Sequence, residues 1–256
     1  MLNAHDLHFR YSKGGKSVLS GASLELQQGE IGILLGKNGS GKTTFFKNIL
    51  GIEKPLKGKI TFEGENLLKM NRRDRAKRIA YVPQHIHFGD LTVLDSVLMG
   101  RISHFGMKAG VQDYIAVEKI LEDMGLTEFA GRSAEALSGG EKQKIAIARA
   151  MAQEPKLMVF DEPTGNLDIA NEHLIIEEAR KLAREKNIAI LSSLHDLNQA
   201  LYFGDKFFLM KEGRVKYAGG KEIMTEDVIR DIFDIDVKIV TINNQKVILG
   251  GYYHEG

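Results

Sequence analysis

The feature that most constrains this chain is a glycine-rich loop between an apolar run and an amphipathic stretch. Residues 36–43 read GKNGSGKT, directly after the continuous apolar run IGILL at 31–35. Such a run bounded by glycines is typical of a strand buried on both faces of a sheet. The following KTTFFKNILGI is predicted to form a helix that ends near Gly51. Strand, loop and helix in this order predict a phosphate-binding P-loop in an α/β fold.

The chemistry of this loop follows from its residue types. Glycines let the backbone wrap closely around phosphate oxygens, and successive N–H groups at a helix start face an anion. The loop lysine is expected to reach the β- and γ-phosphates of a nucleotide, and the Thr43 hydroxyl to ligate Mg²⁺. The residues expected to hold the nucleotide are Gly36, Asn38, Gly39, Ser40, Gly41, Lys42, Thr43 and Thr44.

A pair of carboxylates follows a second apolar run. Residues 156–163 read KLMVFDEP, which places Asp161 and Glu162 at the end of a predicted buried strand. In open parallel sheets, ligands gather beyond the carboxyl ends of strands. Asp161 is therefore expected to hold Mg²⁺, directly or through water, and Glu162 to orient and deprotonate an attacking water. The alternative is a pair of acids at a solvent-exposed strand end.

A second helix start carries two further glycines. Residues 137–143 read LSGGEKQ, and Ser138 precedes Glu141 by the spacing of a capping box. A cap explains the serine, but glycine is costly inside helices, so Gly139 and Gly140 indicate the close approach of another group. Bare amides and a hydroxyl at a helix start form a phosphate site. Two such sites share one triphosphate best if they come from opposite subunits, with two chains sandwiching two ATP molecules head to tail.

The composition of the chain limits which other functions and locations are expected. The 256 residues carry a net charge of +1, which does not favour nucleic acid as a partner. There is no cysteine, which excludes disulfides and thiolate metal sites. We recognise no signal peptide, and no apolar run approaches the roughly 20 residues that span a bilayer. We therefore expect a soluble chain whose membrane role would come through a partner.

The periodicity of the sequence predicts one domain over residues 1–256, with a mostly parallel sheet and an antiparallel β part. The nucleotide-binding core is assigned to about 1–90 and 151–220. A helical period from about 91 to 150 predicts an inserted lobe. The remaining stretch, about 221–256, is a C-terminal extension expected either to form a small hairpin or to cover the core.

Taken together, these motifs resemble those of ABC transporter ATPases. LSGGEKQ resembles the signature motif of that family, and the P-loop and the carboxylate pair stand before and after it in the family's order. The resemblance covers residues 5 to about 215. It implies a P-loop NTPase core with an N-terminal antiparallel β subdomain and an inserted helical subdomain. It also implies ATP hydrolysis with Mg²⁺.

The resemblance assigns roles to four more residues. Tyr11 lies where the family stacks an aromatic ring on adenine, and Gln84 in YVPQ lies at the glutamine-loop position that links the metal site to the helical lobe. Asp168 in GNLD matches the loop that contacts the partner subunit, and His195 in SSLHDL matches the switch histidine. The simpler alternatives are a strand-surface ring for Tyr11, a turn residue for Gln84, an N-cap for Asp168 and a helix cap for His195.

The family's cycle gives these residues one function. ATP bound on the P-loop of one copy is covered by Ser138, Gly139 and Gly140 of the other, so that a homodimer closes. Glu162 then positions the attacking water while His195 contacts the γ-phosphate. The helical lobe is expected to hold a helix of an integral-membrane permease, which places the chain at the cytoplasmic face of the cell membrane. A substrate-binding protein would act only indirectly.

Two stretches indicate the kind of transporter. Residues 91–106, with MGR followed by HFG, and residues 192–220 resemble importers of iron chelates, haem and cobalamin, whose architecture oxyanion importers share. One departure is TGNLD at 164–168, a form that also occurs in lipoprotein- and amino-acid-handling branches. The alternatives are an ATPase of another transporter branch, a soluble ABC ATPase without a permease, and a non-enzymatic scaffold. The intact Glu162 and His195 argue against the scaffold.

Overall fold

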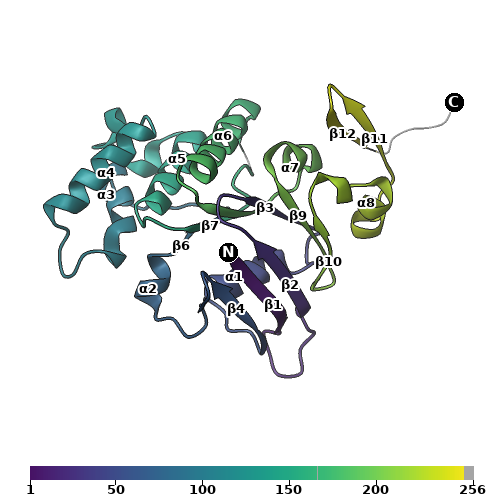
Figure 1. Ribbon diagram of the computed structural model, residues 1–256. Coiled ribbons are helices and arrows are strands. Elements are labelled where there is room, and N and C mark those ends of the chain that lie inside the picture. The colour runs from purple at the N-terminus through teal and green to yellow at the C-terminus, as the bar shows by residue number, and fades with distance from the viewer. Residues whose placement is uncertain (166, 251–256) are drawn as a thin grey trace. The chain divides into compact units, whose positions relative to one another are not determined.

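Two units make up the computed structural model, which describes residues 1–165 and 167–250 (Figure 1). The first unit comprises Met1–Leu68 and Leu191–Gly256, and the second comprises Lys69–Ile190. Within the described ranges, no helix combines the length and the apolar character that crossing a membrane requires.

Alternating side chains give the first unit an antiparallel sheet. Its strands are β1 (Leu2–Phe9), β2 (Leu19–Leu26), β4 (Lys57–Phe62) and β5 (Glu65–Asn66). They are hydrogen-bonded in the order β2-β1-β4-β5, with β1 antiparallel to both of its neighbours. Leu2, Ala4, Leu7 and Phe9 of β1 are buried, whereas the residues between them are more exposed, so one face of this strand packs into the core.

A second group of strands in the first unit carries the glycine-rich loop. β3 (Ile31–Leu35) is buried at every residue and pairs in parallel with β9 (Lys206–Lys211). β9 in turn pairs antiparallel with β10 (Arg214–Gly219). The loop leaves β3 and enters α1 (Lys42–Ile49). This confirms the order of strand, loop and helix that the sequence predicts.

The C-terminal extension of the first unit folds as a short helix followed by a hairpin. Its elements are η4 (Lys221–Ile223), α8 (Glu226–Phe233), β11 (Val237–Ile242) and β12 (Gln245–Gly250). Asn243 and Asn244 form the turn with positive φ values of 49° and 61°, as tight two-residue turns between strands require. Of the two outcomes expected for this stretch, the structure shows the hairpin.

One side chain holds this hairpin to α7 (Leu197–Phe203). The Nδ2 of Asn198 donates to the backbone oxygen of Ile248 at 2.9 Å, and the Ile248 N–H donates to Asn198 Oδ1 at 2.7 Å. The amide of Asn198 therefore satisfies both polar backbone groups of a β12 residue, as a neighbouring strand would.

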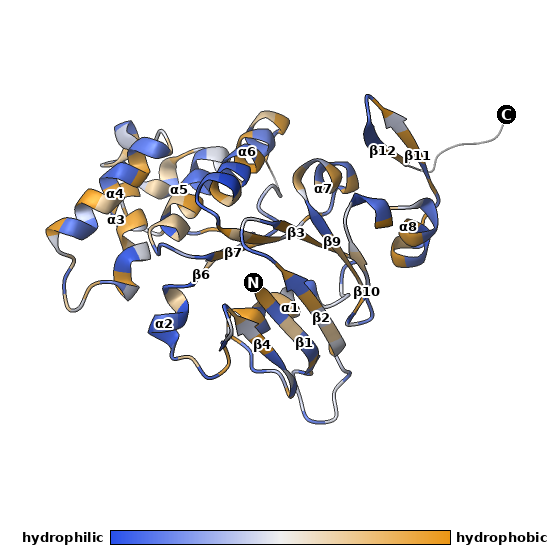
Figure 2. Ribbon diagram, viewed as in Figure 1, coloured by the Kyte–Doolittle hydropathy of each residue, from blue (hydrophilic) through white to orange (hydrophobic). Residues whose placement is uncertain are grey.

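The second unit combines a short pair of strands with helices. β6 (Ile79–Val82) pairs in parallel with β7 (Leu157–Asp161), which is buried at every residue. Its helices and turns are α2 (Arg72–Ala76), α3 (Val93–Leu98), η1 (Met99–Ser103), α4 (Val111–Asp123), η2 (Thr127–Phe129), η3 (Ala134–Ala136), α5 (Gly139–Met151) and α6 (Ile169–Glu185). Hydrophilic and hydrophobic residues alternate along α6, as expected of a helix with one buried face (Figure 2). β8 (Ala189–Ser193) then carries the chain back into the first unit.

The strand pairings confirm the predicted α/β class. The pairs β3-β9 and β6-β7 are parallel, and the strands near the N-terminus are antiparallel. The boundaries expected for the helical lobe, near residues 91 and 150, stay a prediction, because the two units divide after Leu68 and after Ile190.

Candidate functional site

The glycine-rich loop occupies the turn between β3 and α1 in the first unit. Its first glycine leaves no room for a side chain, because a Cβ at Gly36 would lie 2.3 Å from the backbone oxygen of Met210 on β9. Lys42 is buried, and its Nζ donates to Gly36 O at 2.7 Å and to Lys37 O at 3.4 Å. The lysine therefore closes the loop on itself and holds its ammonium group against the loop backbone.

The start of α1 has no side-chain cap. Its N-cap residue is Gly41, which adopts a φ of 108° and offers the helix N–H groups no side-chain acceptor. The hydroxyl of Ser40 is buried and has no hydrogen-bond partner among the described residues. An uncapped helix start beside an orphaned hydroxyl fits a phosphate group. The exposed residues of the loop's predicted binding set are Asn38, Gly39 and Thr43.

Tyr11 adds an aromatic surface beside this loop. Its side chain is 58% exposed, and its ring packs edge-on against Phe9 with the ring centroids 4.9 Å apart. The Tyr11 hydroxyl shares a hydrogen bond of 3.1 Å with Oγ1 of Thr44, and Lys47 Nζ lies 5.9 Å from the ring centroid. An exposed ring held in this way can stack on a nucleobase.

The carboxylate pair stands at the end of β7 in the second unit. Asp161 is buried there, and the Tyr81 hydroxyl on β6 donates to its Oδ2 at 3.5 Å. Burial, and then the charge of Asp161, raise the pKa of Tyr81 to about 12. Tyr81 therefore remains a protonated donor at neutral pH and helps to keep the Asp161 carboxylate in place.

Glu162 follows with an uncommon backbone conformation. Its φ of 53° lies in the left-handed region, which is costly for a glutamate and is concentrated at functional sites. Gln84, just beyond β6, donates its Nε2 to Glu162 Oε2 at 2.5 Å. The structure thus brings Gln84 together with the carboxylate pair, although Gln84 and Glu162 are 78 positions apart in the sequence.

The second glycine-bearing helix start is that of α5. Ser138 is its N-cap: the Glu141 N–H donates to Ser138 Oγ at 3.4 Å, and Glu141 Oε2 accepts from Ser138 N at 2.8 Å and from its hydroxyl at 2.6 Å. These bonds form the capping box that the sequence predicts, and they lower the pKa of Glu141.

The two glycines that follow differ in their surroundings. A Cβ at Gly140 would lie 2.3 Å from Oδ1 of Asn171 on α6, whereas a Cβ at Gly139 would meet nothing closer than 3.7 Å. The close approach predicted from these glycines is therefore partly intramolecular, since Asn171 takes the space beside Gly140. The side of Gly139 has room for another group.

Asp168 caps α6, the simpler of its two predicted roles. The Asn171 N–H donates to Asp168 Oδ1 at 2.8 Å, and Asn171 Nδ2 donates to Oδ2 at 2.9 Å. Contact of Asp168 with a partner subunit stays a prediction. Asn166, in the same loop, lies outside the described residues.

His195 lies in the bend between β8 and α7, and its side chain is exposed. It is not the N-cap of that helix. The N-cap is Asp196, whose Oδ1 accepts from the Gln199 N–H at 2.7 Å. The helix cap, the alternative role for His195, is thus supplied by its neighbour Asp196.

The predicted site residues are divided between the two units. Tyr11, the glycine-rich loop and His195 belong to the first unit, where Tyr11 contacts Thr44. Gln84, the carboxylate pair, the start of α5 and Asp168 belong to the second unit. There, Gln84 contacts Glu162.

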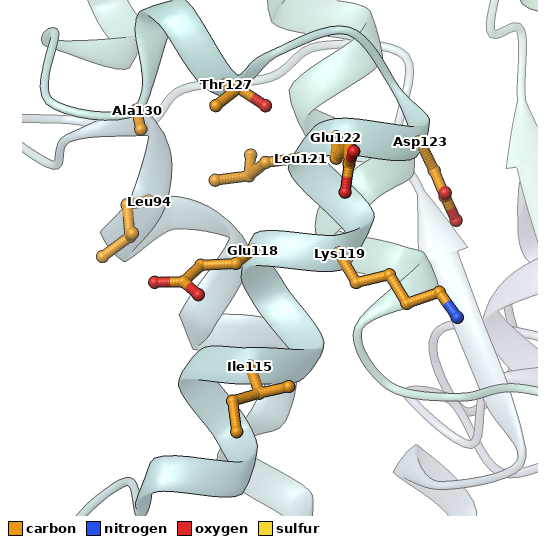
Figure 3. A pocket seen from close by; sticks show the side chains of 9 residues that line it. All are labelled: Leu94, Ile115, Glu118, Lys119, Leu121, Glu122, Asp123, Thr127 and Ala130. Carbon is orange, nitrogen blue, oxygen red and sulfur yellow. The ribbon is translucent and has the colours of Figure 1, made fainter.

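A different pocket, of about 870 Å³, lies in the helical part of the second unit (Figure 3). Among the described residues, its lining carries three carboxylates, on Glu118, Glu122 and Asp123, and a single cation, Lys119. None of the predicted site residues lines this pocket. Its acidic lining is unsuited to binding phosphate.

Known proteins resemble this chain in sequence and in fold. The sequence profile described as "ABC transporter" matches residues 19–165. The iron(3+)-hydroxamate import ATP-binding protein of Bacillus subtilis is 36% identical over 233 residues, which cover 89% of this chain and 86% of that protein. A solved transporter described as of the metal-chelate type, in an inward-facing conformation, matches with a TM-score of 0.84 and 30% identity, covering 99% of this chain and 98% of that one. A dimeric ATP-binding cassette solved in a post-hydrolysis state with ADP and Pi matches with a TM-score of 0.76 and 27% identity, covering 86% and 98%.

A P-loop after a buried strand, a carboxylate pair at a strand end and a serine–glycine helix start define an ATP-binding and ATP-hydrolysing protein. With the matching profile and these relatives, the chain belongs to the ABC transporter family, as an ABC ATPase.

Proposed function

We propose that this chain is the ATP-hydrolysing subunit of an importer, and that the complete transporter carries a metal chelate such as a ferric siderophore, haem or cobalamin. The ferric hydroxamate import protein of Bacillus subtilis and the metal-chelate transporter support this class, because each resembles the chain over most of its length. The chain itself would bind nucleotide and a permease rather than the cargo.

The contact between Gln84 and Glu162 is the observation that carries the proposed chemistry. Glu162 lies at the end of β7 and is oriented by the Gln84 amide, which donates a hydrogen bond but does not protonate the carboxylate. A carboxylate held in this way is suited to act as a general base. We assign Glu162 to orienting and deprotonating the attacking water. His195 is assigned to the γ-phosphate.

The nucleotide is assigned to the first unit. Lys42 and the N–H groups of the loop would bind the phosphates, and Tyr11 would stack on adenine. Mg²⁺ would be held by the Thr43 hydroxyl, Asp161 and Gln84, which offer the oxygen ligands that this ion prefers. When bound, the ion would neutralise charge on the β- and γ-phosphates.

A second copy of the chain would complete the site. Ser138, Gly139 and Gly140 of that copy would approach the γ-phosphate with their N–H and hydroxyl groups. The dimeric cassette with bound ADP and Pi supports this arrangement. Closure would exchange the bonds between Ser138 and Glu141 for bonds to phosphate, and Asp168 would contact the partner copy.

The permease would hold this chain at the cytoplasmic face of the cell membrane. Closure and reopening of the homodimer would move the permease, as nucleotide-driven switches do in other proteins. A substrate-binding protein would act on the permease and not on this chain.

The replacement Glu162→Gln tests the assignment of the general base. We expect it to retain ATP binding, to accumulate as a closed dimer with ATP in size-exclusion chromatography, and to lower phosphate release by about 100-fold or more. Glu185→Gln, at the exposed end of α6, is the matched control and should behave like the parent. Hydrolysis by Glu162→Gln at the parent rate would disprove the assignment.

A further inference from the structure

One carboxylate joins the start of α5 to a distant loop of the second unit. Glu135 lies in η3, three residues before Ser138, and its side chain is 40% exposed. Its Oε2 accepts from the Phe88 N–H at 3.0 Å, and its Oε1 accepts from Lys142 Nζ at 2.9 Å. Each oxygen of the carboxylate thus has its own donor, one on the loop after β6 and the other near the start of α5.

Lys142 carries this contact to the start of the helix itself. Its backbone N–H donates to Ser138 O at 2.9 Å, which fixes the first turn of α5, while its side chain pairs with Glu135. Neither bond of Glu135 occupies the Ser138 hydroxyl or the N–H groups of Gly139 and Gly140. A phosphate can therefore bind at these groups without displacing Glu135.

The Phe88 end of this bridge is held in place by its surroundings. Phe88 is 4% exposed. Just beyond it, the Ala134 N–H donates to Leu91 O and the Val93 N–H donates to Arg132 O, each at 3.0 Å. The segment that carries Phe88 therefore pairs with the segment that leads into Glu135, and the Phe88 N–H is a fixed donor.

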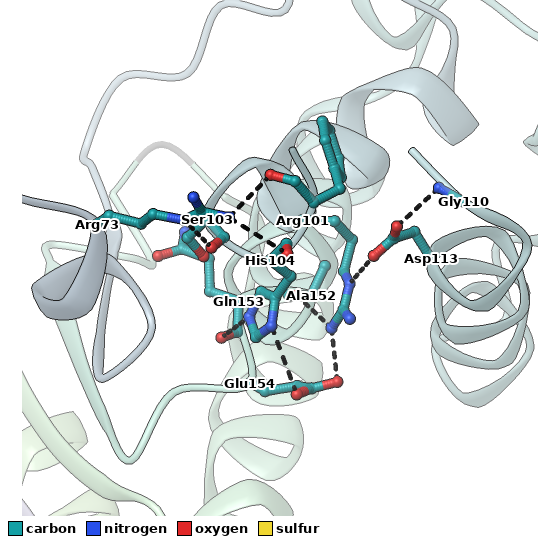
Figure 4. Close-up of polar contacts among 10 residues, drawn as sticks. Arg73, Arg101, Ser103, His104, Gly110, Asp113, Ala152, Gln153 and Glu154 are labelled. Carbon is teal, nitrogen blue, oxygen red and sulfur yellow. Dashed lines mark hydrogen bonds and ion pairs between the residues drawn. The ribbon is translucent and has the colours of Figure 1, made fainter. Parts of the chain in front are cut away.

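The opposite end of α5 is braced by Arg101, in the MGR motif. Its Nε donates to Asp113 Oδ1 at 3.1 Å, and its Nη1 donates to Ala152 O at 3.2 Å and to Glu154 Oε1 at 2.5 Å (Figure 4). This network holds η1, α4 and the end of α5 in one arrangement. Because the far end is fixed in this way, the orientation of the α5 start depends on the contacts made there, and Glu135 supplies two of them.

The charge of Glu135 matters to both contacts. The bond from the Phe88 N–H, and then the bond from Lys142, lower the pKa of Glu135, so its side chain is a carboxylate at neutral pH. An ionised acceptor forms stronger hydrogen bonds than a neutral one. A glutamine at this position could still accept from the Phe88 N–H, but it could not form an ion pair with Lys142. Substitution can therefore separate the two halves of the bridge.

We propose that Glu135 is a positioning residue for the phosphate site at the start of α5: by joining Phe88 to Lys142, it holds that start in the orientation that reaches a phosphate presented by another copy. This inference rests on the proposed two-copy site. Donors that are fixed in advance stabilise developing charge without rearranging during the reaction. Loss of Glu135 should therefore slow hydrolysis at the nucleotide of the partner copy, and it should leave the affinity for ATP unchanged.

Rates and affinities of single variants provide the first test. We expect Glu135→Ala to lower the kcat of phosphate release about 5- to 10-fold while the Kd of ATP changes by less than about twofold. Glu135→Gln, which retains an acceptor for the Phe88 N–H, and Lys142→Met should each lower kcat about two- to threefold. The matched control is Asp123→Asn, since Asp123 is also 40% exposed and pairs with Lys186 at 3.6 Å. A parental kcat in all three variants would overturn the proposal.

Mixed dimers show in which copy Glu135 acts. When Glu135→Ala and Lys42→Ala chains are mixed in equal amounts, about half of the dimers contain one site with an intact lysine from one copy and an intact α5 start from the other. The mixture should then show about 30% of the parent rate. If Glu135 acts in the copy that binds the nucleotide, no such site exists and the mixture stays at or below about 10%, which would overturn the proposal.

A mixture of Lys42→Ala and Ser138→Arg chains is the reference for this experiment. Its failure to recover would overturn the two-copy site, and this inference with it. Recovery of the reference without recovery of the Glu135→Ala mixture would overturn the role of Glu135 alone.

A double-variant cycle decides the question even if Glu135→Ala does not fold. Glu135→Gln and Lys142→Met remove the same ion pair, so the double variant should lose no more activity than Glu135→Gln alone. Losses in kcat that multiply would mean that the two side chains act separately, and would overturn the bridge.

Discussion

The starts of α1 and α5 are both rich in glycine, yet they differ in how their backbone N–H groups are satisfied. α1 begins after Gly41 without a side-chain cap, next to the orphaned hydroxyl of Ser40. α5 begins with Ser138, which forms a complete capping box with Glu141. One helix start is incomplete without an external acceptor, whereas the other is satisfied within the free chain.

This difference suggests an order of events. An anion at the start of α1 forms bonds that the free chain lacks, so it binds without displacing a side-chain cap. A phosphate at the start of α5 must displace bonds between Ser138 and Glu141, which are worth about 1 kcal/mol as a helix cap. We therefore expect the loop to bind nucleotide first, and α5 to engage only a phosphate that another copy already presents.

The largest expected effect comes from removing the buried lysine of the glycine-rich loop, which precedes the uncapped start of α1. Lys42→Ala should lower ATP hydrolysis by about 100-fold or more, because the ammonium group that faces the phosphates is lost. Steady-state phosphate release measures this, with Lys59→Ala on the exposed part of β4 as the control. A variant that retains more than about half of the parent rate would show that the start of α1 is not the phosphate end.

A comparably large effect on hydrolysis, but a small one on binding, is expected at the capped helix. Ser138→Arg should abolish phosphate release while the dissociation constant of ATP changes by less than about threefold, under 1 kcal/mol. Nucleotide titration distinguishes the two helix starts, since a large loss of affinity would mean that Ser138 acts within its own copy.

Mixing the two variants sharpens this distinction. A dimer of one Lys42→Ala chain and one Ser138→Arg chain contains one site with both the lysine and the serine intact. Random pairing should therefore restore about a quarter of the parent rate, since about half of the dimers carry one complete site of two. No recovery on mixing would contradict a head-to-tail dimer whose two sites work independently.

A smaller effect, on stability, is expected from opening the capping box. At pH 7, Glu141→Ala should lower the free energy of unfolding by about 0.5–1 kcal/mol, because the α5 cap is lost. The bonds from Ser138 lower the Glu141 pKa below its ordinary 4.5, so this stabilisation is complete above pH 4.5 and is lost as the pH falls through the lowered pKa. Urea unfolding at pH 7, and again at a pH below the lowered pKa of Glu141, measures the difference in unfolding free energy between the parent and the variant. Glu185→Ala is the control. A deficit that stays constant with pH would exclude the carboxylate as its source.

The smallest effect concerns an ion pair that ties the loop to the C-terminal extension. Lys37 Nζ lies 2.6 Å from Asp234 Oδ2, and these side chains are 47% and 61% exposed. Asp234→Asn should raise ATP affinity by about twofold at low salt, because Lys37 is released toward the phosphates, and this gain should vanish at high salt. Asp236→Asn, which removes one carboxylate partner of Arg230 and leaves its pair with Asp227, is the control. A decrease in affinity would contradict the expected direction.

Local patterns predicted the elements that carry the candidate site. A buried strand followed by glycines and a helix gave the P-loop, and the Ser138–Glu141 spacing gave the capping box. Both features depend on residues within a few positions of one another, so periodicity and capping rules apply to them directly. The same holds for the strand that ends in Asp161.

Contacts between distant segments could not be predicted in this way. Nothing near Gly140 in the sequence indicates that Asn171 fills the space beside it. The cap of α7 is different, because Asp196 is a favoured N-cap residue directly after His195, and the local capping rule could have identified it. The bracing of η1 by Arg101 depends equally on residues far along the chain. The motif around Arg101 was visible in the sequence, but its structural purpose was not.

The amide of Asn198 determines what a truncation at the C-terminus would do. Because it bonds to both the N–H and the carbonyl of Ile248, the last strand cannot slip by one residue without losing both bonds. Cutting the chain before that strand would remove both hydrogen-bond partners that Ile248 offers to the Asn198 amide. Strand β12 thus holds its register against α7 through Asn198, and shortened versions designed for crystallisation or tagging should retain residues up to Gly250.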